Sequence, residues 1–385
     1  MFSSKHYIWT FLIAMFTWGF QILSAQSLPL PPSGGNQKAE VSQYMGMVKA
    51  TFTYNSPDVT DSRGNSREGK IWGQLVPYGL SPNNFGTAKE MPWRAGANEN
   101  TLFSVSHDVM IQGQKLPAGT YGFHIIPGEP NQDWTLIFSQ NTSSWGSYFY
   151  DQSEDVLRVT TRPDKASFHE WLTFGFTDRQ LTQCEAALYW ENLKIPFTIS
   201  VPDMNDLYVA EIEESLRSSA GFNWQNWVSA ANFCVNNQTH LEKGMEWAEA
   251  AVSRPFVGQA NYTTLSTKAN VLMAMNRMED AHKVMDEAME QPTAGVLQIH
   301  QYARQCLARG EKARALEVFQ KNEELHPDTW PVHVGLARGY SAVGNFKKAL
   351  KHAKIAQGNV PEGDQLNAQS VENMIAKLSE GEDVN

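Results

Sequence analysis

The sequence ARQCLARGEKARALEVFQKNEELHP at residues 303–327 is followed, 34 residues later, by ARGYSAVGNFKKALKHAKIAQGNVP at residues 337–361. Alanine recurs at matching places in the two stretches, and both end on proline. Small side chains let paired helices approach closely, while proline ends a helix because it lacks a backbone N–H and crowds the preceding turn. Gly310 and Gly344 mark a turn inside each stretch. The spacing predicts a solenoid of helical hairpins.

Two further copies of this pattern precede the quoted stretches. The nearer copy contains Ala269, Ala281, Ala288 and Pro292, and the earlier, degenerate copy contains Asn232, Gly244, Ala251 and Pro255. The 34-residue spacing and its small residues resemble the tetratricopeptide family. The resemblance implies a concave surface, built from the first helix of each repeat, that holds a protein or peptide partner.

The side chains that follow the anchor alanines are candidates for that surface. They are Asn270, Arg304 and Arg338, each one position after the alanine of its repeat. In a helix this position turns away from the packed alanine, so the three side chains are predicted to form a polar line. The alternative interpretation is that they are ordinary solvated side chains on an exposed helix face.

Residues 39–201 show a different pattern, in which short runs rich in Val, Ile, Thr, Tyr, Phe and Trp alternate with Gly, Pro, Asn and Asp. This pattern is typical of antiparallel strands. We expect strands near residues 39–44, 48–54, 70–74, 101–106, 108–111, 119–126, 134–139, 156–161, 170–176, 185–190 and 193–200, with tight hairpins at 111–114 and 190–193. The chain is therefore predicted to be a multidomain β + α protein, with an antiparallel β-sandwich or barrel-like domain followed by an all-α tetratricopeptide-type solenoid.

Four motifs occur in order within the β-rich region. They are PWRAGANENT at residues 92–101, LPAGTYG at 116–122, IPG at 126–128 and WGSYFYD at 145–151. Together they resemble domain-of-unknown-function family 2911 over most of residues 38–201. The resemblance implies no activity, because that family is defined without an established function.

The first of these motifs gathers polar side chains beside a glycine-bearing turn. Trp93, Arg94, Asn98 and Glu99 lie within a few positions of one another and can build a polar binding corner. Arg94 and Glu99 can hold a ligand there. They can equally pair with each other and with the loop backbone to fix a long crossover.

Two more residues of the β-rich region are candidate ligand contacts. His124 lies among apolar neighbours on a predicted strand and faces either a pocket or solvent, or is a structural histidine with a satisfied hydrogen bond. Trp145 and the tyrosines beside it can form a platform for a sugar, although aromatic residues near strands also fill sandwich cores.

Catalytic sequence patterns do not occur in this chain. It has no phosphate-binding glycine loop, dinucleotide fingerprint or nucleophile elbow, and His169-Glu170 lacks the second histidine of a zinc protease. The sequence thus predicts no metal site and no cofactor, and it favours a protein that is not an enzyme. Cys184, Cys234 and Cys306 match no metal or redox spacing and are interpreted as buried small hydrophobes.

The chain is predicted to be exported. Residues 1–25 combine a basic start, a long apolar run and small residues before a cleavage point, which is typical of a signal peptide. The alternative interpretation is a permanent membrane anchor, for which the apolar run is slightly short. No later run is long and apolar enough to span a bilayer, so we expect a periplasmic or extracellular protein with no membrane span after signal cleavage. With 31 Lys+Arg against 41 Asp+Glu, the net charge of −10 argues against nucleic acid as a partner.

These patterns divide the chain into segments and yield two functional hypotheses. The segments are a signal peptide at 1–25, a linker at 26–37, a β-rich domain at 38–203, a connecting helix at 204–222, tetratricopeptide-like repeats at 223–361, and a capping helix and tail at 362–385. The favoured hypothesis is an envelope interaction or scaffold protein that uses the repeat surface. The alternative is an enzyme or a ligand-binding β domain, with carbohydrate as one ligand class, whose site lies near Arg94 and Glu99.

Overall fold

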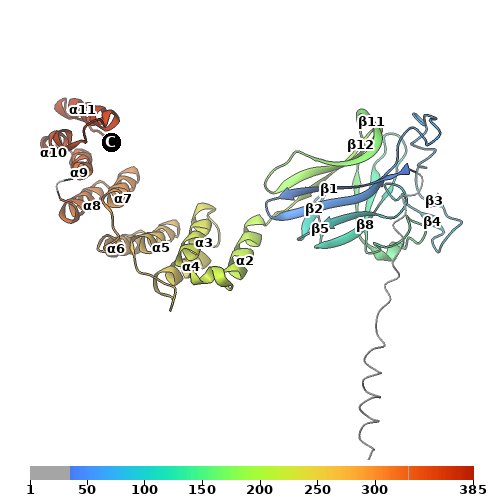
Figure 1. Cartoon of the computed structure of the whole chain (residues 1–385), viewed down its shortest axis with the longest axis horizontal. Helices are drawn as coiled ribbons and strands as arrows, with labels where there is room; N and C mark the ends of the chain where they lie inside the picture. Colours follow the sequence, from blue (N-terminus) through green and yellow to red (C-terminus); the bar gives the residue numbers. More distant parts are fainter. Residues whose placement is uncertain (1–34, 328) are drawn as a thin grey trace, which may run out of the picture. The chain divides into compact units, whose positions relative to one another are not determined.

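A computed structural model describes residues 35–327 and 329–385 of the chain (Figure 1). The predicted signal peptide and residues 26–34 of the predicted linker lie outside the described residues. The chain forms two compact units that divide between Met204 and Asn205. We call them the β unit and the helical unit, and each is described by itself. Within the described ranges, no helix is long and apolar enough to cross a membrane.

The β unit contains two main antiparallel sheets. The larger has the strand order β1-β2-β5-β8-β9-β10 and the smaller the order β11-β12-β6-β7, and β3 pairs with β4 in a short ribbon. The strands of the larger sheet are β1 (Gln37–Met45), β2 (Val48–Ser56), β5 (Thr101–Val105), β8 (Gly119–Ile126), β9 (Trp134–Ser139) and β10 (Asp155–Thr161). The others are β6 (Val109–Ile111), β7 (Gln114–Leu116), β11 (Asp164–Thr177), β12 (Gln183–Ser200), β3 (Ser81–Pro82) and β4 (Glu90–Met91), and a 3₁₀ helix, η2, covers Gln152–Glu154.

Phenylalanine rings from the two sheets meet in the core of the β unit. Successive side chains of a strand point to opposite faces, and most of β2 alternates between buried and half-buried residues accordingly. Phe52 on β2 is fully buried, and its ring stacks on Phe174 of β11 with the centroids 4.2 Å apart. Four more rings surround Phe52, those of Phe103, Phe123, Phe176 and Phe197. The predicted β-sandwich is therefore confirmed.

One predicted hairpin is confirmed and the other is wrong. β6 and β7 pair across residues 111–114, where Gln112 and Gly113 have φ angles of 48° and 77°, as a type I′ turn requires. At 190–193, β12 continues without a break. Glu191 has a φ of 52°, and the register with β11 shifts on both sides of its partner His169. The left-handed residue therefore forms a β-bulge in a long strand and not a turn between two strands.

The strand predicted at residues 70–74 does not form. This segment makes turns, and its main ladder contact is an isolated bridge between Trp72 and Val76. Gly69 and Gly73 have φ angles of 70° and 83°, which interrupt an extended backbone. The apolar side chains of this segment therefore pack into the core from a loop and not from a strand.

Over the residues that the structure describes, the helical unit contains four helical hairpins between a first helix and a last one. The first is α2 (Met204–Leu216), followed by a 3₁₀ turn, η3 (Ser219–Phe222), and the last is α11 (Gln365–Ser379). The hairpins are α3 (Trp224–Asn236) with α4 (Leu241–Ser253), α5 (Tyr262–Ala274) with α6 (Met278–Met289), α7 (Val296–Ala308) with α8 (Lys312–Leu325), and α9 (Trp330–Ala342) with α10 (Phe346–Asn359). The starts of α5, α7 and α9 are separated by the 34-residue spacing of the sequence, which confirms the predicted repeats.

The anchor alanines are buried between the packed helices. The alanines at 269, 281, 303, 315, 337 and 349 all have zero exposure. In the degenerate first repeat, the fully buried residue is Ala231 and not the predicted anchor Asn232. Because α3 begins 38 residues before α5, the residue of α3 that corresponds to the anchor Ala269 is Ala231. Asn232 is the residue that follows this anchor position. The first hairpin is thus offset by one residue from the sequence-based alignment.

The three cysteines are buried and free, as the sequence predicts. Cys184 lies on β12, Cys234 on α3 and Cys306 on α7. Burial raises the pKa of the Cys184 and Cys306 thiols to about 11, so both are protonated at neutral pH.

Replacing Phe52 with alanine is expected to lower the free energy of unfolding of the β unit by about 3–5 kcal/mol, because it leaves a cavity among the stacked rings. Urea unfolding followed by near-ultraviolet circular dichroism measures this change. The matched control is Phe168→Ala on β11, whose side chain is 47% exposed and whose loss is expected to cost about 0.5 kcal/mol or less. Equal losses in the two variants would show that Phe52 does not join the sheets.

Candidate functional site

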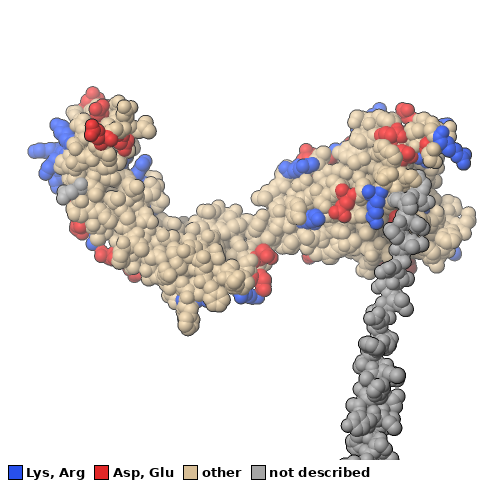
Figure 2. Space-filling view, in the orientation of Figure 1, with Lys and Arg blue, Asp and Glu red and all other residues tan. Residues whose placement is uncertain are grey.

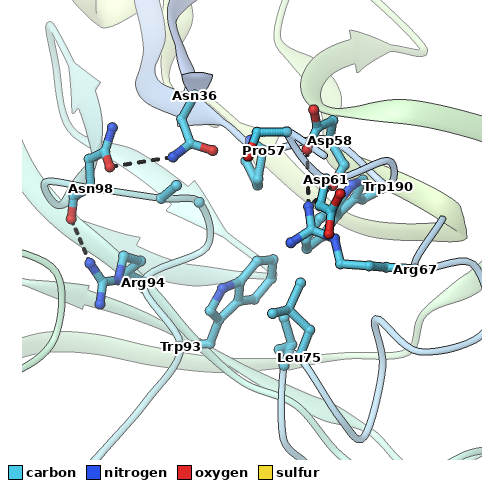
Figure 3. A pocket seen from close by; sticks show the side chains of 14 residues that line it. Asn36, Pro57, Asp58, Asp61, Arg67, Leu75, Trp93, Arg94, Asn98 and Trp190 are labelled. Atoms are coloured by element: carbon cyan, nitrogen blue, oxygen red, sulfur yellow. Dashed lines mark hydrogen bonds and ion pairs between the residues drawn. The ribbon is translucent and has the colours of Figure 1, made fainter. Parts of the chain in front are cut away.

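A pocket in the β unit has a volume of about 450 Å³ (Figure 3). Three of the predicted ligand contacts, Trp93, Arg94 and Asn98, line it together. Figure 3 shows Arg94 and Asn98 on one side of the space and Asp58, Asp61 and Arg67 on the other. The pocket therefore presents cationic, anionic and amide groups, with Trp93 between them.

Short hydrogen bonds fix both polar sides of the pocket. Arg94 Nη1 donates to the carbonyl oxygen of Asn98 over 2.6 Å, and its guanidinium lies 5.1 Å from the ring centre of Tyr148. A side chain at Gly146 would collide with this guanidinium, since a Cβ there would lie 2.2 Å from Arg94 Cζ. On the other side, Arg67 Nη2 lies 3.0 Å from Asp58 Oδ1.

The carboxylate of Asp61 is held by its own loop. It accepts hydrogen bonds from the backbone N–H and the side-chain amide of Asn65, and these lower the pKa of Asp61. Asp61 therefore stays ionised at neutral pH. Neither Asp61 nor Arg67 was predicted from the sequence as a ligand contact.

Indole rings form the floor of the pocket. Trp93 and Trp190 stack with centroids 6.1 Å apart and an interplanar angle of 14°. Trp72 packs edge-on against both rings and also against Trp134. Trp72 and Trp134 line a second space, of about 370 Å³, so the indole cluster lies between two pockets. The four tryptophans come from residues 72 to 190, a span over which no sequence motif connects them.

Three predicted ligand contacts do not line the pocket. The carboxylate of Glu99 accepts a hydrogen bond of 2.7 Å from Asn55, and no ion pair between Glu99 and Arg94 is present among the described residues. Trp145 is 49% exposed and lies outside the pocket. Arg94 and Glu99 therefore have different partners. Arg94 donates to the backbone of Asn98, and Glu99 accepts from the side chain of Asn55.

His124 is the third of these residues, and it is buried. Its Nδ1 lies 2.8 Å from the hydroxyl oxygen of Ser147, and its side chain is 2% exposed. Burial, and then the charge of Arg94, lower the pKa of His124 to about 4. The residue is therefore a neutral structural histidine behind the pocket wall.

The second candidate site is the surface made by the first helices of the repeats. Asn270 on α5 lines a groove of about 340 Å³ between α5 and α7, together with Ser266, Gln301 and Gln305. Arg304 on α7 is exposed, and Arg338 on α9 is half-buried. The structure places these three predicted residues on successive first helices.

Arg304 and Arg338 act on each other without a neutralising carboxylate. Burial, and then the charge of Arg304, lower the pKa of Arg338. Burial and both arginines lower the pKa of His300, on the same helix as Arg304, to about 4. Among the described residues, no acidic side chain forms an ion pair with either arginine, and Arg338 Nε is buried without a hydrogen-bond partner. We call Arg304 and Arg338, with the neutral His300 beside them, the cationic cluster; its positive charge lies on the two guanidiniums.

Residues 383–385 lie against α9 beside the cationic cluster. Arg338 Nη1 donates to the carbonyl oxygen of Val384 over 3.0 Å, and the backbone N–H of Val384 donates to Ser341. Asn385 in turn donates to the carbonyl oxygen of Arg338. A short segment of polypeptide is thus held on α9 by main-chain and side-chain hydrogen bonds.

The architecture defines an antiparallel β-sandwich domain joined to a solenoid of helical hairpins. Residues 36–199 match the family described as "Protein of unknown function (DUF2911)", so the chain carries a DUF2911 domain. The helical region that follows matches structures of tetratricopeptide repeats. Among curated proteins, none matches this sequence.

Two of the similar solved structures are tetratricopeptide proteins. One is a thermophilic protein of Thermus thermophilus, with 16% identity and a TM-score of 0.30 over 44% of this chain and 90% of that chain. The other is YrrB, described as a protein with an unusual peptide-binding site, with 18% identity and a TM-score of 0.30 over 44% of this chain and 85% of that chain.

The imidazole of His124 is expected to remain neutral until the pH falls well below 6. Its pKa of about 4 is lower than the ordinary value of 6.5, so between these values the unfolded chain binds a proton that the folded chain does not. The free energy of unfolding of the β unit should therefore fall as the pH decreases from about 6.5 towards 4. A nuclear magnetic resonance titration, with the His124→Gln spectrum for assignment, should give a midpoint near 4; a midpoint near 6.5 would contradict the buried neutral state.

Proposed function

We propose that this is an exported interaction protein whose helical repeats hold an acidic segment of a partner protein. The observation that carries the proposal is the cationic cluster, in which two guanidiniums repel each other on adjacent first helices with no described carboxylate to neutralise them. The chain as a whole is acidic, with a net charge of −10. A local positive site in such a chain favours an anionic ligand.

The chemistry of arginine supports a carboxylate-bearing ligand. A guanidinium offers planar, paired N–H donors that match a carboxylate, and such charge-assisted bonds are stronger than neutral ones. An acidic side chain placed between Arg304 and Arg338 would replace their mutual repulsion with two attractions. It would also give Arg338 Nε, which is buried without a described partner, an acceptor.

The groove beside the cationic cluster supports a peptide as the form of the ligand. Gln301 and Gln305 on α7 face the groove with Asn270, and amide side chains can bond to the main chain of an extended segment. Side chains of α9 bind the main chain of residues 383–385 in a comparable way, through the Arg338 guanidinium and the Ser341 hydroxyl. Export of the protein, to the periplasm or beyond, is supported by the composition of residues 1–25.

The acidic-peptide proposal predicts a charge-dependent complex. A fluorescein-labelled peptide of alternating glutamate and alanine should bind the full chain, whereas the same peptide with glutamine in place of glutamate should not. Arg304→Gln and Arg338→Gln should each weaken binding roughly tenfold or more, since a hydrogen bond to a charged group contributes about 1.5–3 kcal/mol. Fluorescence anisotropy at low and high salt measures the affinity, and screening should weaken it.

The matched control for this experiment is Arg277→Gln in the same unit. Arg277 is also exposed, but its guanidinium already pairs with Asp280 at 2.8 Å. Its replacement should leave the affinity unchanged. Equal weakening by Arg277→Gln, or binding of the neutral peptide with the same affinity, would refute a specific role for the cationic cluster.

A second candidate function is binding of a polar small molecule, with a sugar as the favoured class, in the pocket of the β unit. The observation that favours it is the half-buried indole of Trp93, which stacks on the buried Trp190 and lies beside carboxylate, amide and guanidinium groups. A sugar ring presents an apolar face that packs on an indole and hydroxyls that bond to charged and amide groups. The alternative hypothesis from the sequence was a ligand-binding site near Arg94 and Glu99. Arg94 lines this pocket, whereas Glu99 does not.

The sugar proposal is tested by intrinsic tryptophan fluorescence. Titration with the neutral oligosaccharides cellotriose and maltotriose should change the emission of the wild-type chain, because Trp93 and Trp190 line the pocket. Trp93→Leu should reduce this response and weaken binding. Trp145→Leu, an exposed position outside the pocket, should leave both unchanged. A response that survives in Trp93→Leu and disappears in Trp145→Leu would place the sugar elsewhere.

A further inference from the structure

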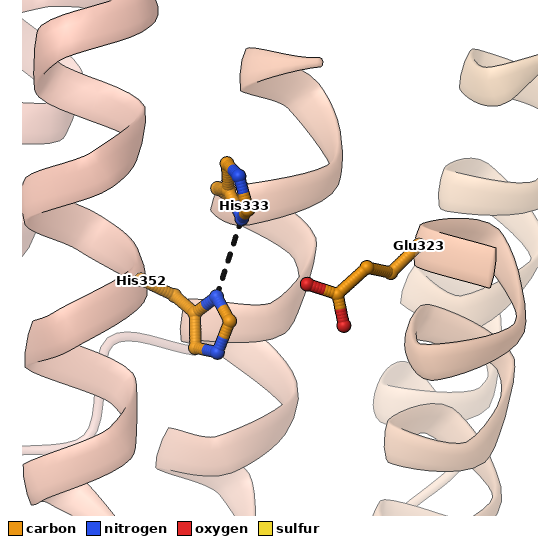
Figure 4. A group of neighbouring side chains, drawn as sticks. All are labelled: Glu323, His333 and His352. Atoms are coloured by element: carbon orange, nitrogen blue, oxygen red, sulfur yellow. Dashed lines mark hydrogen bonds between the residues drawn. The ribbon is translucent and has the colours of Figure 1, made fainter. Parts of the chain in front are cut away.

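Three potential metal ligands converge on the helical unit away from the residues discussed so far. Glu323 lies on α8, His333 on α9 and His352 on α10 (Figure 4). Each offers one ligand atom, and these atoms all lie within 4.8 Å of one another. The three helices are consecutive in the chain, so the cluster joins two neighbouring repeats.

The two imidazoles are placed as they would be around one metal ion. The Nδ1 atoms of His333 and His352 lie 3.2 Å apart. Two nitrogens bound to one tetrahedral Zn²⁺ at about 2.0–2.1 Å from the metal lie roughly 3.3 Å apart. The observed separation therefore needs almost no adjustment to admit the ion between the rings.

The ligand atoms have no stronger partners in the structure. Two Nδ1 atoms that face each other can share only one proton, so one of them must be protonated for a hydrogen bond to form at all. The carboxylate of Glu323 makes no hydrogen bond or ion pair with any other described residue, and Figure 4 shows it directed towards the two rings. A divalent cation would satisfy all three groups together.

Positive charge also lies near the three ligand atoms, on Lys348 and Lys351 of α10. The lysines of α10, seen as a group of blue side chains in Figure 2, act against a cation, but Lys348 and Lys351 are exposed and water screens their charge.

Neighbouring side chains hold the rings in position. His333 is 7% exposed, and the ring of Tyr340 stacks on His352 with centroids 5.5 Å apart. The hydroxyl of Tyr340 accepts a hydrogen bond of 3.2 Å from Gln320. Residues that orient the ligands in this way are a regular part of protein metal sites.

We propose that Glu323, His333 and His352 form a binding site for one divalent transition-metal ion, with Zn²⁺ as the favoured ion. Two imidazole nitrogens and one carboxylate are an established set of three zinc ligands that leaves a fourth position for water. The ion would link α8 to α9 and α10 and stabilise the packing of one repeat on the next. This site is independent of the proposed peptide and sugar sites.

Isothermal titration of the full chain, prepared without a polyhistidine tag, with ZnCl₂ tests the proposal. We expect one Zn²⁺ per chain, and we expect Co²⁺ in its place to give the visible absorption of a four-coordinate ion. Glu323→Gln and His352→Ala should each weaken Zn²⁺ binding by roughly tenfold or more. Zn²⁺ should raise the unfolding temperature of the helical unit in the wild type and much less in these variants.

The matched control is His282→Ala, which removes an imidazole that lies 3.3 Å from the carboxylate of Glu311 in the same unit. That pair resembles the proposed site in chemistry but is not part of a described cluster of three ligands, so Zn²⁺ binding should be unchanged. Far-ultraviolet circular dichroism without metal verifies that each variant folds. Absence of Zn²⁺ binding to the wild type, or equal binding by folded Glu323→Gln and His352→Ala, would overturn the proposal.

Discussion

The packing of helices in the helical unit depends on the small side chains at its alanine positions. Two helices can approach closely only where neither presents more than a methyl group, and Ala303 and Ala315 meet this condition within one hairpin. The same pair of positions recurs as Ala337 and Ala349 in the next repeat. Because this packing fixes the rotation of each helix, it also fixes which side chains reach the surface. The cationic cluster and the proposed metal ligands are both consequences of that rotation.

This dependence explains which features the sequence could predict. A 34-residue spacing of small residues is visible without coordinates, and it led directly to the hairpins and to Arg304 and Arg338. The three proposed metal ligands lie ten and nineteen positions apart, on three different helices. Their convergence depends on how one hairpin packs on the next, which no local spacing encodes. The one-residue error at Asn232 arose where the first hairpin departs from the regular repeat length.

In the β unit, local patterns predicted the strands better than their connections. Alternation of apolar residues located most strands, because a half-buried strand exposes every second side chain. A left-handed residue such as Glu191 carries the same sequence signal in a bulge as in a turn, so the long β12 was predicted as two strands. The motif at residues 92–101 contributed Trp93, Arg94 and Asn98 to the pocket. Other residues that line the pocket, among them Asp61, Arg67 and Trp190, lie far from this motif in the sequence, and only the folded sandwich brings them together.

Each unit contains at least one buried cysteine, and modification of that thiol reports how often the unit around it unfolds locally. One thiol lies within the core of the β unit and two lie within the helical unit, and all three are free. A thiol that is both buried and protonated reacts only during the moments when its surroundings unfold. The rate at which Cys184 becomes modified therefore reflects the motions of the sandwich, while the rates at Cys234 and Cys306 reflect those of the solenoid. In an oxidising compartment, the survival of these thiols depends on how seldom either core opens.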